Sequence, residues 1–89
     1  MSRAKGVAFT AVVTDIREES RKAGKQRWQM MLDPTEFVVG DVGELEAVAR
    51  SGARLVVPVL DVVKDAAGGV WHVVEKPLVA GTKVIGRVG

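Results

Sequence analysis

The chain has 89 residues, a formal net charge of +2 and an apolar content of 47%. This length accommodates one domain and excludes a second, so residues 1–89 are expected to fold as a single unit. The absence of cysteine excludes disulfides and thiolate zinc sites. No stretch is apolar and long enough for a signal peptide or a membrane span, so we expect a cytoplasmic protein without a membrane partner.

The first predicted strand covers residues 7–16, which are rich in β-branched side chains and contain neither glycine nor proline. Val13 and Ile16 would fall on opposite faces of a regular strand. A bulge or sharp bend is therefore expected at residues 14–15. The charged stretch that follows, residues 17–25, is expected to form a loop between two strands.

The next segment, residues 26–32, alternates between polar and apolar positions, which predicts a half-buried strand. Its apolar face carries Trp28, Met30 and Leu32. Core packing is therefore the expected role of Trp28. A turn at residues 33–35, where Pro34 presets the backbone, then leads to a short strand over 36–39.

A helix is predicted over residues 42–51. Asp41 is suited to its N-cap, and Glu44, three residues on, completes a capping box. Leu45, Val48 and Ala49 share one face at helical spacing, and Gly52 fits the position after the last turn.

The second half of the chain predicts strands at 54–64, 70–76 and 83–88, with a glycine-rich hairpin loop at 65–69. Because proline has no N–H for a sheet ladder, Pro58 is expected on an edge or at a bulge. The predicted core combines the inward positions of these elements: Val13, Met30, Leu32, Leu45, Val48 and Val57.

The order of these elements resembles the OB-fold, a small Greek-key barrel with a helix between its third and fourth strands. The likeness is closest in VVTDIREESRKAGKQRWQMMLD, residues 12–33, which is similar to the first hairpin of OB domains in bacterial replicative polymerases. Residues 59–75 resemble the closing hairpin of such barrels. We therefore expect a mostly β fold: an OB-like barrel of five to six strands with one short helix. The chain departs from the pattern in lacking tyrosine and in being acidic over residues 36–46.

Catalysis has little support in the sequence. The single histidine, His72, has no cysteine partner, and its strand position places it on the same side as Val70 and Val74. No phosphate-binding glycine loop, nucleophile elbow or metalloprotease motif is present. We therefore expect a non-enzymatic protein with no catalytic residue, cofactor or metal.

The strongest functional pattern is the charge distribution. Residues 17–27 hold five cations and two acids, a local net charge of +3, whereas residues 33–46 hold five acids and no base. Clustered cations favour phosphate binding through counterion release, and in OB domains this loop contacts single strands. The candidate nucleic-acid-binding residues are Arg17, Arg21, Lys22, Lys25, Arg27, Gln29, Met31 and Trp71. Trp71 either stacks on a base or packs in the core, and the sequence leaves both roles open.

Two classes of function follow. The first is a binding module for single-stranded nucleic acid, with DNA favoured over RNA. The second is a protein-interaction or structural module, such as an oligomerising or virion component, whose edge strands meet protein partners or a second copy. The basic loop favours the first class. The acidic segment and the low aromatic content of 4% favour the second.

Overall fold

The computed structural model describes residues 7–19, 26–49 and 51–89, and this part of the chain is mostly β, with seven antiparallel strands and no helix. The mostly β, barrel-like class is confirmed, but the prediction of five to six strands with a helix is wrong. The strands are β1 (Val7–Glu18), β2 (Trp28–Asp33), β3 (Gly43–Val48), β4 (Arg54–Val59), β5 (Asp61–Lys64), β6 (Val70–Val74) and β7 (Lys83–Val88).

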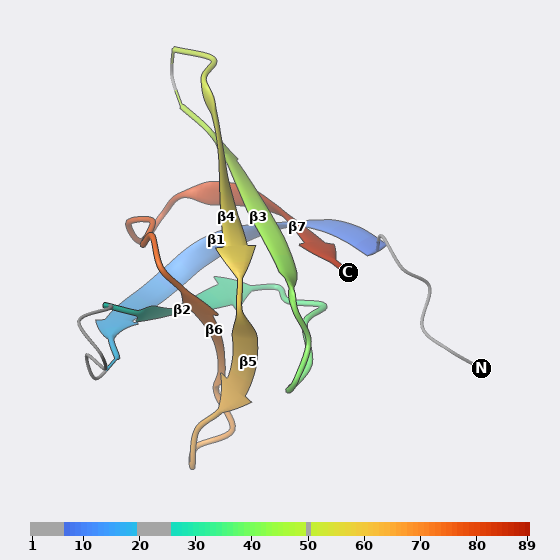
Figure 1. The fold of residues 1–89 in the computed structure, drawn as a ribbon, viewed down its shortest axis with the longest axis vertical. Helices are drawn as coiled ribbons and strands as arrows, with labels where there is room; N and C mark the ends of the chain where they lie inside the picture. Colours follow the sequence, from blue (N-terminus) through green and yellow to red (C-terminus); the bar gives the residue numbers. More distant parts are fainter. Residues whose placement is uncertain (1–6, 20–25, 50) are drawn as a thin grey trace.

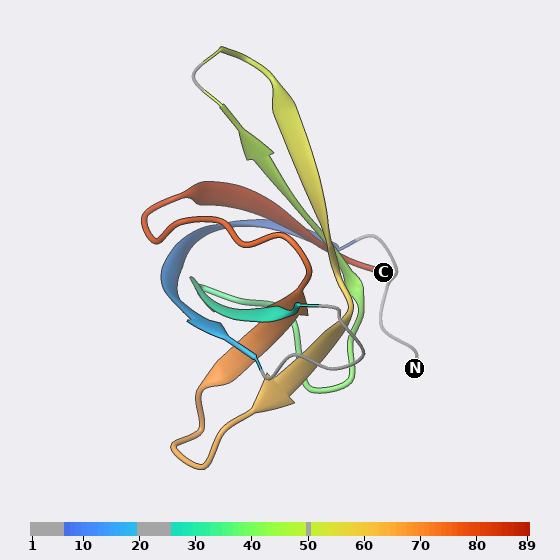
Figure 2. The ribbon, with the colours of Figure 1, turned by 60° about the vertical axis from the view of Figure 1, so that its left-hand side comes forward.

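The seven strands form a single sheet in the order β4-β3-β7-β1-β2-β6-β5. Figures 1 and 2 show that this sheet curls into a half-barrel, with the β3–β4 hairpin extending well beyond the remaining strands. The curl brings the chain after β4 against β6, where the Leu60 N–H donates to the Val73 carbonyl at 2.8 Å. β4 is the first strand in the sheet order, so of the two predicted positions for Pro58, an edge or a bulge, the structure shows the edge.

The core fills the inside of the curl with side chains from all seven strands, together with Phe37 and Leu78 from loops. Five predicted core residues are buried there: Val13, Met30, Leu32, Leu45 and Val57. The sixth, Val48, is 57% exposed, so its placement in the core was wrong. Side chains alternate between the two faces of a strand, and Val48 follows Ala47, which faces the core, so Val48 lies on the outward face.

The segment predicted to be a helix over residues 42–51 contains strand β3 instead. Leu45 and Ala47 face the core at a period of two, and β3 is paired on both sides, with β4 and with β7. The Asp41 carboxylate accepts the Val38 N–H at 2.9 Å and so closes a turn. Gly52 does adopt the positive φ expected of a residue after a helix, at 87°, but it does so in the β3–β4 turn, where its N–H donates to the Ala49 carbonyl.

The strand predicted over residues 36–39 is absent, and an irregular loop connects β2 to β3. Its start is fixed by His72, which is fully buried on β6. A carbonyl only accepts, so the 2.8 Å contact with the Met30 oxygen places the proton on His72 Nδ1. Nε2 then accepts from the Thr35 hydroxyl at 2.8 Å, and the Thr35 oxygen accepts the Phe37 N–H. These bonds hold the loop without a strand ladder.

Candidate nucleic-acid interface

Arg17 reaches the outward face of the sheet because β1 contains a bulge. The register of β1 against β2 shifts between Val13 and Asp15, which confirms the irregularity predicted at residues 14–15. One extra residue moves every later side chain to the other face. Ile16 therefore packs on the core, and Arg17 lies outside it, opposite Gln29.

Strand pairing brings four of the eight predicted site residues onto this outward face. Gln29 lies opposite Arg17 on one side and opposite Val73 of β6 on the other. Met31 and Trp71 each follow one alternation further along their strands, on the same face. The four residues from three strands are Arg17, Gln29, Met31 and Trp71.

The guanidinium of Arg17 lies over the Trp71 ring on the outward surface. Its central carbon is 3.9 Å from the centroid of the Trp71 ring, a cation–π contact. Its Nε donates to Gln29 Oε1 at 2.7 Å, and Gln29 Nε2 donates to Glu19 Oε2 at 2.8 Å. This chain of hydrogen bonds fixes the position of the guanidinium, so the sheet presents a planar, charged group to solvent.

Trp71 supports Arg17 and is not itself available as an open stacking surface. The residue is 5% exposed although it lies outside the central apolar cluster. Its Nε1 donates to Asp65 Oδ2 at 2.8 Å, and Asp65 Oδ1 accepts the N–H groups of Ala67 and Gly69. The bond from Trp71, followed by that from Gly69, lowers the pKa of Asp65. The β5–β6 loop thus locks the indole ring in place.

The remaining site residues are placed less uniformly. The methyl group of Met31 covers Gly69, where an added Cβ would approach it to 2.6 Å. Arg27 is exposed, and its carbonyl accepts the Glu19 N–H at 2.8 Å, which closes the base of the β1–β2 hairpin. Trp28 is partly buried against the core, on the apolar side as predicted. Arg21, Lys22 and Lys25 lie outside the described residues.

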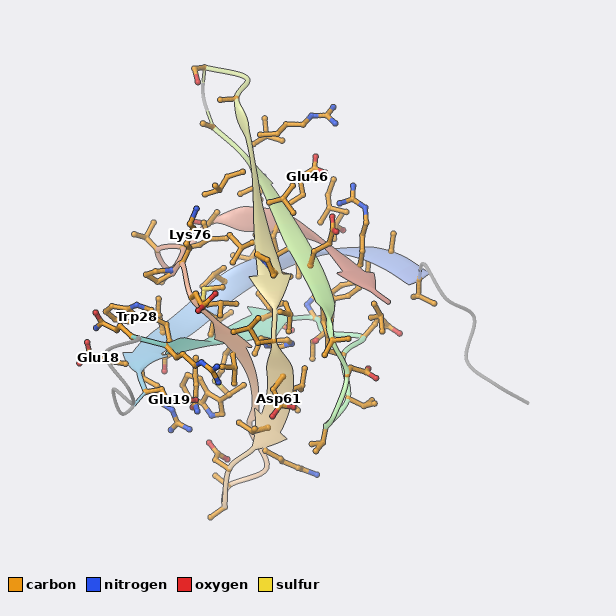
Figure 3. The ribbon with its side chains drawn as sticks, in the orientation of Figure 1. Glu18, Glu19, Trp28, Glu46, Asp61 and Lys76 are labelled. Atoms are coloured by element: carbon orange, nitrogen blue, oxygen red, sulfur yellow. The ribbon has the colours of Figure 1, made fainter. Side chains whose placement is uncertain are left out.

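Sequence reasoning missed two carboxylates that position this site. Asp65 follows β5, where an aspartate is typical of a turn, but its bond to Trp71 depends on how the hairpin folds. Glu19 was counted only as a charge that offsets the basic loop, whereas it holds Gln29 in place. Figure 3 shows Glu18 and Glu19 close to Trp28 at this end of the molecule.

Two acids of the acidic segment, Glu44 and Glu46, are paired within the sheet on β3, whereas Asp33 ends β2, two residues after Met31 on the same face. Glu46 lies on β3, well separated from Glu18 and Glu19 in Figure 3. Arg87 on β7 binds Glu46 at 2.8 Å and Glu44 at 3.1 Å, and the hydrogen bond that it donates to Glu46 raises the pKa of Arg87. Arg54 approaches Glu46 at 3.5 Å. Two of the five acids in this segment are therefore paired with arginines on neighbouring strands.

A groove of about 620 Å³ crosses β1, β7 and β3, and its lining includes Thr10, Val12, Val48 and Ile85. Within the described ranges, no cluster of three or more histidine, aspartate or glutamate side chains could hold a metal ion. The same ranges contain no helix capable of crossing a bilayer.

Comparisons with protein-family models, curated proteins and solved structures found no match to this chain. The assignment of function therefore depends on the geometry of the molecule itself.

Proposed function

We propose that this domain binds single-stranded nucleic acid, DNA in preference to RNA, on the outward face of β1, β2 and β6 and along the adjoining basic loop. The observation that carries the proposal is the guanidinium of Arg17, held against Trp71 and bonded to Gln29. An arginine plane offers both a stacking surface for a base and a positive charge for a phosphate.

The geometry changes the role proposed for Trp71. Because Arg17 covers the ring and only 5% of the residue is exposed, a base stacks on the guanidinium, with the indole beneath it. Trp71 then acts as a positioning residue. Gln29 orients the guanidinium, and Met31 extends the surface towards the β5–β6 loop.

The basic loop supplies the long-range attraction. Residues 17–27 carry a local net charge of +3, and a cluster of this kind releases counterions when it meets phosphates. The loop joins β1 to β2 and therefore starts and ends beside Arg17 and Arg27. The resemblance of residues 12–33 to the first hairpin of OB domains supports the same surface.

The test is a fluorescence-anisotropy titration of a labelled single-stranded oligonucleotide at two salt concentrations. Arg17→Lys keeps the charge but removes the planar stacking surface. We expect it to weaken binding by about fivefold or more at both salt concentrations, since one stacked base contributes about 1–3 kcal/mol. Arg54→Lys makes the same change at an exposed arginine on β4 and serves as the matched control.

The loop cations are tested by neutralising Arg21, Lys22 and Lys25 together. Each lost phosphate contact is expected to reduce the salt dependence of binding by about 0.7 in the log–log slope. If the wild-type domain shows no affinity for DNA or RNA oligonucleotides even at low salt, the proposal is wrong. The protein-interaction alternative then replaces it.

A further inference from the structure

The β3–β4 hairpin exposes an unusual number of apolar side chains. Val48 is 57% exposed, Leu55 42% and Val56 46%. Figures 1 and 2 show this hairpin extending beyond the curled sheet. Val48 follows the last β3 residue that pairs with β7, and Leu55 and Val56 lie close to it on β4. Leu55 lies on the face of β4 whose later residues are buried in the core, and Val56 lies on the outward face. Exposed apolar groups on both faces indicate an interaction surface.

The same hairpin has an open backbone edge. The Ala49 N–H donates to the Ala53 carbonyl, so Ala53 faces β3. Backbone groups alternate along an antiparallel strand, so Leu55 and Val57 also face β3, whereas Arg54 and Val56 point away from it. By the same alternation the backbone of Leu60 points away from β3, and its N–H does bond to β6.

The open part of the edge is short and well defined. Pro58 has the same outward parity as Arg54 and Val56 but lacks an N–H group. The edge of β4 therefore offers complete donor and acceptor pairs at Arg54 and Val56. Neither pair has a partner strand in the part of the chain that the structure describes. Native proteins usually cover or block such an edge.

We propose that a second copy of this chain covers it, by antiparallel pairing of β4 with β4 across a twofold axis at Leu55. Arg54 of each copy then pairs with Val56 of the other, and both residues use their outward N–H and C=O groups. An axis at Val56 would instead set Arg54 against Pro58, which cannot donate. The Leu55 register is therefore the one that satisfies these backbone groups.

The side chains fit a second copy because each surface complements itself. Leu55 meets Leu55 on one face of the joined sheet, in a closely spaced pair. On the other face, Arg54 lies opposite Val56 of the second copy. Within that copy, Val56 pairs with Glu46 on β3. The charge of Arg54, whose side chain is 73% exposed, thus meets an acidic strand in both copies. An interface of this kind is isologous and closes after two subunits.

The first test measures mass in solution by sedimentation over a wide concentration range. Pairing along this short edge buries less area than a standard interface of about 800 Å² per partner. We therefore expect a weak dimer, seen as a change from monomer to dimer with rising concentration. Val56→Pro removes the outward N–H without removing a bond to β3, and it should abolish the dimer. Val79→Lys, at a position that is 76% exposed and outside the hairpin, should leave it unchanged. Melting temperatures verify that each variant is folded. A wild type that stays monomeric at every concentration would overturn the proposal.

The second test fixes the register and uses the absence of cysteine from the chain. In the proposed pairing the two Leu55 Cα atoms lie about 4.5 Å apart, within the range of a disulfide, so Leu55→Cys should form a covalent dimer on mild oxidation. The two Val56 residues are diagonal to each other, about 7–8 Å apart, so Val56→Cys should cross-link more slowly. Faster cross-linking of Val56→Cys would overturn the Leu55-centred pairing. Neither test depends on Arg17 or Trp71, so this inference and the nucleic-acid proposal fail separately.

Discussion

Acidification is expected to destabilise the domain through His72. The imidazole is fully buried on β6, between the Met30 carbonyl and the Thr35 hydroxyl, with the Phe37 ring packed edge-on at 5.2 Å. Burial lowers the pKa of His72, because the charged ring would lose its hydration, and the bond to Met30 only partly opposes this effect. The folded protein therefore holds His72 neutral under conditions in which the unfolded chain binds a proton.

The sign and the upper limit of the effect follow from proton linkage. Above the unfolded pKa of about 6.5, both states are neutral and the full stability is present. As the pH falls from there towards the lowered folded pKa, the unfolded state binds more protons, so the free energy of unfolding decreases. One proton limits the slope to about 1.4 kcal/mol per pH unit. Below the folded pKa, this group causes no further loss.

Urea denaturation between about pH 5 and pH 8 measures this slope. His72→Phe keeps an aromatic ring beside Phe37 but removes the titrating group. We expect it to lower stability by about 1–3 kcal/mol, because the Met30 carbonyl and Thr35 hydroxyl lose a partner, and to flatten the pH dependence. His72 is the only histidine, so no other side chain ordinarily titrates in this window. An equal slope in wild type and variant would refute the reasoning.

Two further predictions concern packing. Leu32→Ala should lower the free energy of unfolding by about 2–5 kcal/mol, measured by denaturant titration, and an unchanged midpoint would contradict the assignment of this side chain to the core. Gly43→Ala should lower the free energy of unfolding by about 1–3 kcal/mol, because its Cβ would meet the Arg87 carbonyl oxygen and the Phe37 ring. The control is Gly89→Ala, whose Cβ meets nothing within 4 Å and which should melt like the wild type.

Several elements could be predicted because their local pattern permits one solution. Residues 26–32 alternate over a full strand, and β2 was found with Met30 and Leu32 on its buried face. The glycine-rich segment 65–69 forms the expected hairpin loop. The bulge at residues 14–15 was predicted because Val13 and Ile16 are both apolar but would point to opposite faces of a regular strand. In each case the two-residue period of a strand determines which side chains are buried.

Residues 42–51 were predicted incorrectly because two periods fit so short a segment. Leu45, Val48 and Ala49 match a helix, but Leu45 and Ala47 match a strand equally well. Helix propensity and a capping box contribute only about a kilocalorie per mole. Pairing with β4 over all of β3 and with β7 from Gly43 to Ala47 bonds most of its backbone on both sides, and Leu45 is completely buried. β7 is distant in sequence, since Glu46 pairs with Ile85, so no local pattern contains this part of the preference.

The candidate site divides in the same way. Its cations, its outward strand face and the presence of Trp71 near a turn are properties of the sequence alone. The tertiary structure decided that Arg17 covers Trp71, that Gln29 and Glu19 hold the guanidinium, and that Asp65 fixes the indole. The physical reason is that alternation determines which face a side chain occupies. Its neighbours across the sheet depend on the register between strands, which only the folded chain establishes.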